Sequence, residues 1–224
     1  MIKKTLSALC VVFLLCALLT GSLLALSVSP AVMANRFTAC ARGESLGPLR
    51  EQYGEIAAMV TDYLTGRTDT FQYTFSWQGN TYAAFHDYEQ RHMEDVRRLY
   101  SLCGTVTAIC AATGLCCLLV LLMLKAGKIL RKACLFVVPV FTALVLAAAI
   151  WAAFDFDGLF IAFHRLLFTN ELWLLESATD CLILLMPTEF FVSYAAMILA
   201  TFLLAAAAIW CVAFFAGKRQ TIST

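Results

Sequence analysis

Four long runs of apolar residues constrain this 224-residue chain more than any other feature of its sequence. They lie at approximately residues 6–28, 102–124, 133–154 and 193–216. Each run is long enough to cross the hydrocarbon core of a bilayer, which takes roughly 20 helical residues. Because lipid cannot hydrogen-bond to backbone N–H and C=O groups, each run has to be helical. We therefore expect an all-α integral membrane protein with four transmembrane helices.

The composition agrees with a membrane location. Hydrophobic residues make up 62% of the chain and charged residues only 14%, a balance that is too apolar for a soluble domain. The first run follows Lys3 and Lys4, and residues 31–34 resemble a signal-peptide cleavage site. A signal core is usually about 7–15 apolar residues long, however, and this run is longer. We therefore expect a retained anchor helix, and a single membrane domain over residues 1–224.

The distribution of charge predicts the orientation of the helices. Half of the 16 basic residues flank the runs on one side, with no acidic residue among them: Lys3, Lys4, Lys125, Lys128, Arg131, Lys132, Lys218 and Arg219. All 15 acidic residues fall in the other segments, 29–101 and 155–192. Because basic flanks stay in the cytoplasm, both termini, the turn at 125–132 and the tail at 217–224 are expected there. Segments 29–101 and 155–192 are then external.

External segment 29–101 combines helical and strand patterns. Apolar residues recur at helical spacing within 51–65, which predicts a helix. Polar and aromatic residues alternate over 70–77, as in a strand, and a turn at 78–80 leads to a partner strand at 81–85. We therefore expect a small β-hairpin with one aromatic face. Residues 88–100 have a helical pattern that should continue without a break into the run at 102–124.

External segment 155–192 contains two further apolar pieces, at residues 159–168 and 181–186. Both are too short to span a bilayer and too apolar to be fully solvated. Helices of this kind lie in the membrane interface with their apolar face in the lipid. We expect them to form an interfacial, amphipathic helical lid across the outer ends of the membrane helices.

The cysteine and charge patterns exclude several classes of function. Eight of the ten cysteines lie in or next to the apolar runs, where they are expected to be small packing residues. Cys40 and Cys181 lie in the external segments, where oxidation is allowed, and the sequence leaves a bond between them open. The net charge of +1 gives no indication of nucleic-acid binding. No Cys-x-x-Cys pattern or Gly-rich phosphate loop is present, and we expect neither a cofactor nor a metal ion.

Three histidines offer the most suggestive chemistry, because all of them fall at the external membrane surface. His86 and His92 precede the second run, and His164 lies in the first interfacial piece. Imidazole is the side chain best suited to proton transfer near neutral pH. Two histidines at the same depth in the membrane can therefore form an acid–base pair. His92 has Glu89 one helical turn before it and Asp95 one turn after it. Either carboxylate would be able to orient the His92 imidazole.

Other interpretations compete with catalysis at this point. Charged residues beside a membrane helix are most often only its solvated end. Metal binding by the histidines is disfavoured, because the six-residue spacing between His86 and His92 does not place both on one helical face. Transport is disfavoured as well, because the four runs contain no Asp, Glu, Lys or Arg.

Two short motifs resemble those of the bacterial lipoprotein intramolecular transacylases. The first is Glu89-x-x-His92-Met93-x-Asp95-Val96, and the second is Phe163-His164-x-x-x-Phe168. The later residues Asn170, Trp173, Asp180 and Pro187-x-Glu189-Phe190-Phe191 are similar to the same family's continuation of this loop. Four membrane helices, inward termini and two external segments also match, so the resemblance covers most of the chain.

The resemblance implies a defined reaction in the bacterial cytoplasmic membrane. The substrate would be a lipoprotein whose N-terminal cysteine carries a diacylglyceryl thioether and a free α-amine. The enzyme would move the sn-2 acyl chain from glycerol to that amine, which gives a lyso-form lipoprotein. Membrane lipids and this lipoprotein would be its partners, and the active site would face outward.

The resemblance also assigns residues to this reaction. The histidines that match His92 and His164 are the catalytic ones, and we expect His92 to be the base and His164 the acid or oxyanion partner, or the reverse. The supporting residues would be Glu89, Asp95, Asn170, Trp173, Asp180 and Glu189. The alternatives are a non-catalytic membrane sensor or assembly protein, or another interfacial enzyme such as a lipid acyltransferase or a metal-dependent hydrolase.

Overall fold

The computed structural model describes residues 1–222, with side chains as far as residue 216. The chain divides into two compact units, which we describe separately. The membrane unit comprises Met1–Leu23, Cys103–Phe154 and the chain from Ile198 onward, and the site unit comprises Leu24–Leu102 and Asp155–Met197. The basic residues Lys218 and Arg219, which entered the orientation argument, lie outside the described side chains.

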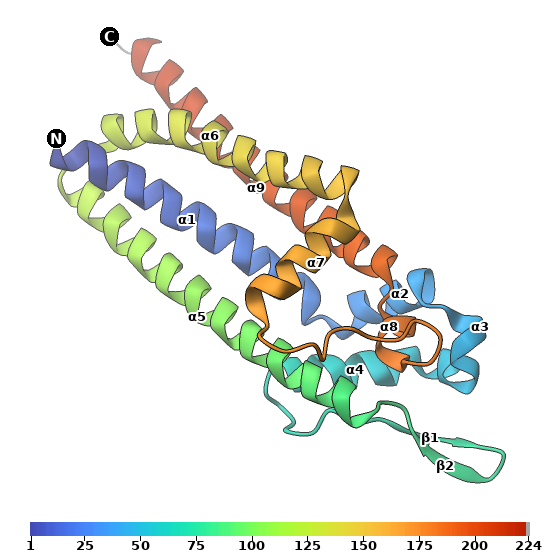
Figure 1. Cartoon of the computed structure of the whole chain (residues 1–224). Helices are drawn as coiled ribbons and strands as arrows, with labels where there is room; N and C mark the ends of the chain where they lie inside the picture. Colours follow the sequence, from blue (N-terminus) through green and yellow to red (C-terminus); the bar gives the residue numbers. More distant parts are fainter. Residues whose placement is uncertain (223–224) are drawn as a thin grey trace. The chain divides into compact units, whose positions relative to one another are not determined.

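Within the described residues, four helices are long and apolar enough to cross a membrane (Figure 1). They are α1 (Ile2–Ser27), α5 (Asp87–Met123), α6 (Gly127–Phe154) and α9 (Thr188–Ile222). Large apolar side chains on them are exposed, among them Leu119, Phe136 and Leu204. An exposed apolar surface of this extent is suited to lipid rather than to water. The prediction of a mostly helical protein with four candidate spans is confirmed.

Helices α1 and α5 approach closely within the membrane unit. A Cβ atom at Gly114 would lie 2.8 Å from the Leu14 side chain, so the glycine permits this approach. Thr107 donates a hydrogen bond from Oγ1 to Oγ1 of Thr20 at 2.8 Å. Small residues and interhelical hydrogen bonds are the means by which helices associate in lipid, where apolar contact alone gives little preference.

The site unit is built from short elements and the first turns of α5 and α9. The elements are α2 (Pro30–Cys40), α3 (Gly43–Leu46), the 3-10 helix η1 (Gly47–Gln52), α4 (Tyr53–Leu64), β1 (Thr74–Trp77), β2 (Asn80–Ala83), α7 (Phe156–Leu167) and α8 (Cys181–Leu185). Its core contains the fully buried side chains of Phe37, Ile56, Val60 and Leu185. Helix α4 forms where the helical spacing within 51–65 predicted one, whereas α2, α3 and η1 were not predicted.

The predicted hairpin is present but shorter than its alternating pattern. β1 and β2 pair antiparallel, from Thr74 opposite Ala83 to Trp77 opposite Asn80. The turn residues Gln78 and Gly79 have φ values of 49° and 82°, as in a type I′ turn. The first strand was expected from residue 70, but Phe71 is instead buried in the core of the unit.

Helix α5 is continuous from Asp87 to Met123, as the sequence predicted. Its first turns carry charged residues, and its remainder from about residue 102 is the apolar run. The three histidines and the aromatic rings that contact them belong to the site unit. All ten cysteines are free, and Cys181 is buried.

Candidate active site

The two histidines of the resemblance lie next to each other. His92 lies on the second turn of α5 and His164 near the end of α7, and each side chain is only 7% exposed. Their ring centroids are 6.1 Å apart, with an angle of 33° between the planes. The site unit thus brings together two imidazoles that are 72 positions apart in the sequence.

His164 is held in an aromatic enclosure. The rings of Phe160, Phe168 and Trp173 lie 4.0, 5.5 and 5.0 Å from its ring, between centroids. Its Nδ1 lies 2.7 Å from the backbone carbonyl oxygen of Phe160. Since a carbonyl oxygen only accepts, Nδ1 carries the proton of the neutral ring and Nε2 is left with a lone pair. Burial lowers the pKa of His164, and this hydrogen bond opposes the shift.

His92 is also buried, but its ring is bonded differently. It packs edge-on against Phe168 at 5.3 Å. Its Nδ1 is enclosed and has no hydrogen-bond partner among the described residues. Burial lowers the pKa of His92 to about 4; the neighbouring His164 adds to this effect and Asp95 opposes it. Both imidazoles are therefore neutral near pH 7, the form needed to take up a proton or to donate a neutral hydrogen bond.

A chain of hydrogen bonds joins α5 to the loop after α7. Asp95 accepts a hydrogen bond on Oδ2 from Nδ2 of Asn170 at 2.9 Å, and its Oδ1 lies 3.1 Å from Arg98. The backbone carbonyl oxygen of Asn170 accepts one from Nε1 of Trp173 at 3.0 Å. Since Trp173 packs on His164, these hydrogen bonds link the helix that carries His92 to one wall of the His164 enclosure.

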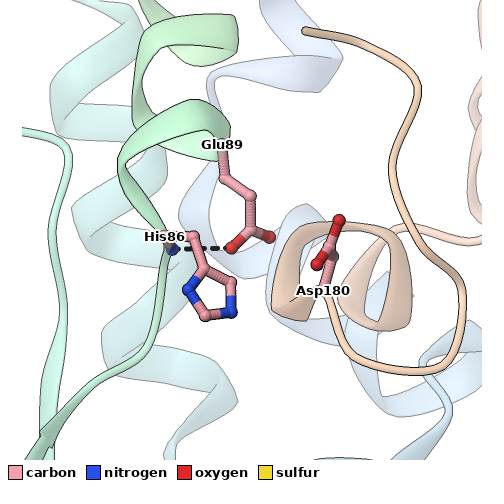
Figure 2. Close-up of side chains that lie close together, drawn as sticks. All are labelled: His86, Glu89 and Asp180. Carbon is pink, nitrogen blue, oxygen red and sulfur yellow. Dashed lines mark hydrogen bonds between the residues drawn. The ribbon is translucent and has the colours of Figure 1, made fainter.

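The Glu89 carboxylate does not bond to the His92 imidazole, although its spacing had made it one of two carboxylates able to orient that ring. Its oxygens accept hydrogen bonds from the backbone N–H groups of His86 and Leu182, each at 2.7 Å. Figure 2 shows this carboxylate at the start of α5, facing that of Asp180. Glu89 is fully buried, and burial raises its pKa while the two N–H donors oppose the shift. Its position indicates a role in holding the start of α5 against α8.

Asp180 and Glu189 occupy different surroundings. Asp180 is 1% exposed, accepts hydrogen bonds from the Tyr88 and Thr179 hydroxyls on Oδ1, and accepts one from the backbone N–H of Glu176 on Oδ2. Glu189 lies in the first turn of α9 with its side chain exposed. Asp180 therefore supports the loop before α8, whereas no hydrogen bond joins Glu189 to either histidine in the described structure.

Two residues of the site were not predicted from the sequence. Phe160 supplies both the carbonyl oxygen and the nearest ring for His164, and Tyr88 donates its hydroxyl hydrogen to Asp180. Phe160 lies four residues before His164, one helical turn away, so the spacing alone contained this signal. No local pattern indicates the contact between Tyr88 and Asp180, which are 92 positions apart.

Comparison with known proteins identifies the family to which this arrangement belongs. The sequence profile described as "Lipoprotein intramolecular transacylase Lit" matches residues 7–191, which is most of the chain. This chain belongs to the Lit family of lipoprotein intramolecular transacylases. It is accordingly an acyltransferase of the membrane, with a lipoprotein as the substrate class.

Solved structures of Lit from Bacillus cereus, determined in meso, have the same fold. One of them superposes with a TM-score of 0.80 at 16% sequence identity and covers 99% of this chain and 98% of the other. Two variants of the Bacillus cereus protein, in which a histidine is replaced by alanine or by arginine, superpose with TM-scores of 0.73 and 0.70. Their sequence identities to this chain are 16% and 17%. No curated protein sequence matches this chain.

Proposed function

We propose that this Lit-family chain forms lyso-form lipoprotein by histidine acid–base catalysis. The sn-2 acyl chain of the diacylglyceryl group moves from glycerol to the α-amine of the N-terminal cysteine. The observation that carries the proposal is the pair of buried imidazoles, His92 and His164, with ring centroids 6.1 Å apart. Two such groups match a reaction in which one atom loses a proton and another gains one.

The hydrogen bond at Nδ1 of His164 supports that residue as the base. With Nδ1–H directed to the carbonyl oxygen of Phe160, the Nε2 lone pair is available to take a proton from the substrate amine. The sequence had favoured His92 as the base while leaving the reverse assignment open. The backbone hydrogen bond favours the reverse assignment, because it determines which nitrogen of His164 carries the proton.

His92 is then the hydrogen-bond donor of the pair. Its Nδ1 is buried and has no hydrogen-bond partner in the described part of the chain, and an unpaired acceptor is tolerated more often in proteins than an unpaired N–H group. The proton of the neutral ring therefore belongs on Nε2. An Nε2–H group beside the reacting ester would stabilise the developing oxyanion, as a preformed donor does in acyl-transfer enzymes.

The proposed steps are balanced: one carbon–nitrogen bond forms, one carbon–oxygen bond breaks, and one proton moves from nitrogen to oxygen. The amine nitrogen attacks the sn-2 ester carbonyl carbon, and its proton passes to Nε2 of His164. The tetrahedral oxyanion accepts a hydrogen bond from Nε2 of His92. The carbon–oxygen bond to glycerol then breaks, and the leaving oxygen takes the proton from His164. An ester is converted to a more stable amide, so no nucleotide is consumed.

Positioning would supply much of the rate, because the amine and the ester belong to one molecule. Well-oriented intramolecular reactions gain about 7–11 kcal/mol from proximity. The hydrogen bonds among Asp95, Asn170 and Trp173 would fix the position of the His164 enclosure relative to the start of α5. Glu89 and Asp180 would hold the start of α5 and the loop before α8 in place.

The substrate suggests a site at the external membrane interface, since its acyl chains need lipid and its peptide needs water. Helix α7 has the surface that such a position requires: Ile161, Phe163 and Leu166 are exposed, while His164 on the same helix is buried. The acidic segments 29–101 and 155–192 would face outward and both termini would lie in the cytoplasm. The protein would thus act in a bacterial cytoplasmic membrane.

Mass spectrometry of the N-terminal lipopeptide tests this proposal. In bacterial cells that lack other N-acylating enzymes, expression of the chain should convert a diacylglyceryl lipoprotein to the lyso-form. His92→Ala and His164→Ala should each reduce that product by about 10²–10⁴-fold. Arg165→Ala, which removes an exposed neighbour of His164, is the matched control and should retain the conversion. If the sn-2 chain stays on glycerol with the wild-type protein, the proposal is wrong.

A further inference from the structure

A second cluster of ionisable side chains lies in the site unit, and none of its members transfers a proton in the proposed reaction. It consists of His86, Glu89 and Asp180, each of which offers one ligand atom, and these atoms all lie within 4.8 Å of one another. Figure 2 shows the imidazole and the two carboxylates close together. Glu89 and Asp180 are 0% and 1% exposed, and His86 is exposed.

Glu89 and Asp180 are buried, and neither forms an ion pair with a lysine or arginine among the described side chains. The ion pairs among the described side chains are Arg67–Asp62, Arg97–Asp69 and Arg98–Asp95, and none of them reaches this cluster. The donors to Glu89 and Asp180 are backbone N–H groups and the neutral hydroxyls of Tyr88 and Thr179. Two buried carboxylates side by side repel each other unless a proton or a cation lies between them. His86 is the one group of the cluster that can be positively charged.

The spacing of the three groups fits an ion better than a direct contact. His86 forms no direct ion pair with either carboxylate, yet its ligand nitrogen lies within 4.8 Å of both ligand oxygens. A zinc ion binds nitrogen and oxygen ligands at about 2.0–2.2 Å in a tetrahedral arrangement, so two of its ligand atoms are separated by about 3.4 Å. Side-chain movements of less than about 1 Å would therefore complete such a site.

The carboxylates also retain the capacity to bind a cation. Each oxygen of Glu89, and Oδ2 of Asp180, accepts a single backbone N–H bond. A carboxylate oxygen has two acceptor positions, so each has one left. Backbone donors of this kind orient ligating carboxylates in metal sites. The exposed His86 ring provides the side from which an ion can enter.

We infer that His86, Glu89 and Asp180 bind a divalent cation of the zinc class, with water completing its coordination. One imidazole nitrogen and two carboxylate oxygens form a ligand set that zinc accepts. The cation would join the start of α5 to the loop before α8, and its ligand Glu89 lies one helical turn before His92. This inference does not depend on the reaction proposed above, because it concerns residues outside the His92–His164 pair.

Isothermal titration calorimetry, which measures the heat of zinc binding to the full-length protein in detergent micelles, tests the inference. The protein is treated with EDTA, dialysed and reacted with N-ethylmaleimide so that cysteine thiols do not bind metal, and ZnCl₂ is then titrated. We expect one saturable zinc site per chain. His86→Ala and Asp180→Asn should each remove it or weaken its affinity by at least about tenfold. His164→Ala, which removes a histidine of the other pair, is the matched control and should bind zinc as the wild type does.

Three results would overturn the inference. They are the absence of saturable zinc binding by the wild type, unchanged binding by His86→Ala, and loss of binding in His164→Ala instead. His86 is exposed, so its alanine variant should keep the wild-type circular dichroism spectrum. If it does not, Asp180→Asn provides the same comparison. Acyl transfer is not measured in this experiment, so its result is separate from the test of the proposed function.

Discussion

Replacing His92 by glutamine should remove part of the acid sensitivity of the fold. The His92 imidazole is buried and has a folded-state pKa of about 4, against an ordinary value of 6.5. The unfolded chain therefore takes up a proton at this residue near pH 6.5, whereas the folded chain takes one up only near pH 4. Stability from this residue is complete above pH 6.5 and is lost as the pH falls towards 4. Glutamine fills similar space and does not titrate, so the variant lacks this contribution.

The size of the effect follows from the two pKa values. Each pH unit between them corresponds to about 1.4 kcal/mol of differential proton binding. A pH of 5 lies about 1.5 units below the unfolded-state pKa and above the folded-state pKa, so the unfolded chain is protonated at His92 and the folded chain is not. The wild type should therefore lose about 2 kcal/mol of unfolding free energy between pH 7.5 and pH 5 that His92→Gln does not lose.

The assay is unfolding in mixed micelles by SDS titration at pH 7.5 and at pH 5, for the wild type and for His92→Gln. The comparison of the two proteins cancels the contributions of other titrating groups. Met93→Leu, a substitution at the buried residue next to His92, is the control. It should change the unfolding free energy by the same amount at both pH values. If the wild type and His92→Gln lose the same free energy on acidification, His92 is not a buried neutral imidazole and its proposed role as a neutral donor is refuted.

Three further predictions concern the residues around the pair. Asn170→Ala should reduce lyso-lipoprotein formation by about tenfold, the equivalent of one lost hydrogen bond to the charged Asp95, and Asn170→Asp should reduce it further through repulsion; equal activity of the two variants would contradict this. Trp173→Phe keeps a ring on His164 and should retain more product by mass spectrometry than Trp173→Ala, which removes the ring as well as the donor. Glu89→Ala should lower the unfolding free energy by about 2–5 kcal/mol, because two buried N–H groups lose their acceptor. Glu89→Gln keeps an acceptor oxygen and should lower it by less. SDS titration measures both variants, and an equal loss would argue against the acceptor role.

The membrane helices and the histidine pair were predictable to different degrees. The four spans follow from run length and apolarity, which are local properties of the chain, and the continuous α5 follows from the same pattern. His92 and His164 were selected by residue type and by resemblance. Their separation of 6.1 Å depends on where the site unit places His164 of α7 relative to the first turns of α5, which no spacing in the sequence specifies.

Helical spacing was misleading for Glu89, because it predicts nearness along a helix but not the partner of a side chain. The carboxylate lies one turn before His92, yet it accepts hydrogen bonds from backbone N–H groups of His86 and Leu182. The first N–H groups of a helix have no acceptor within it, and a buried carboxylate satisfies them. The pattern at 70–77 was misleading in a similar way, because burial of Phe71 in the core competes with strand pairing.

The sequence by itself determined that this chain crosses a membrane and that its three histidines lie outside the four long apolar runs. These properties depend on the solvation of each run in lipid, to which distant residues contribute little. The tertiary structure alone decided which nitrogen of His164 carries the proton, that Asp95 bonds to Asn170, and that Glu89 faces Asp180. Each of these depends on burial and on partners from other elements, and burial is what makes a hydrogen bond or a charge energetically decisive.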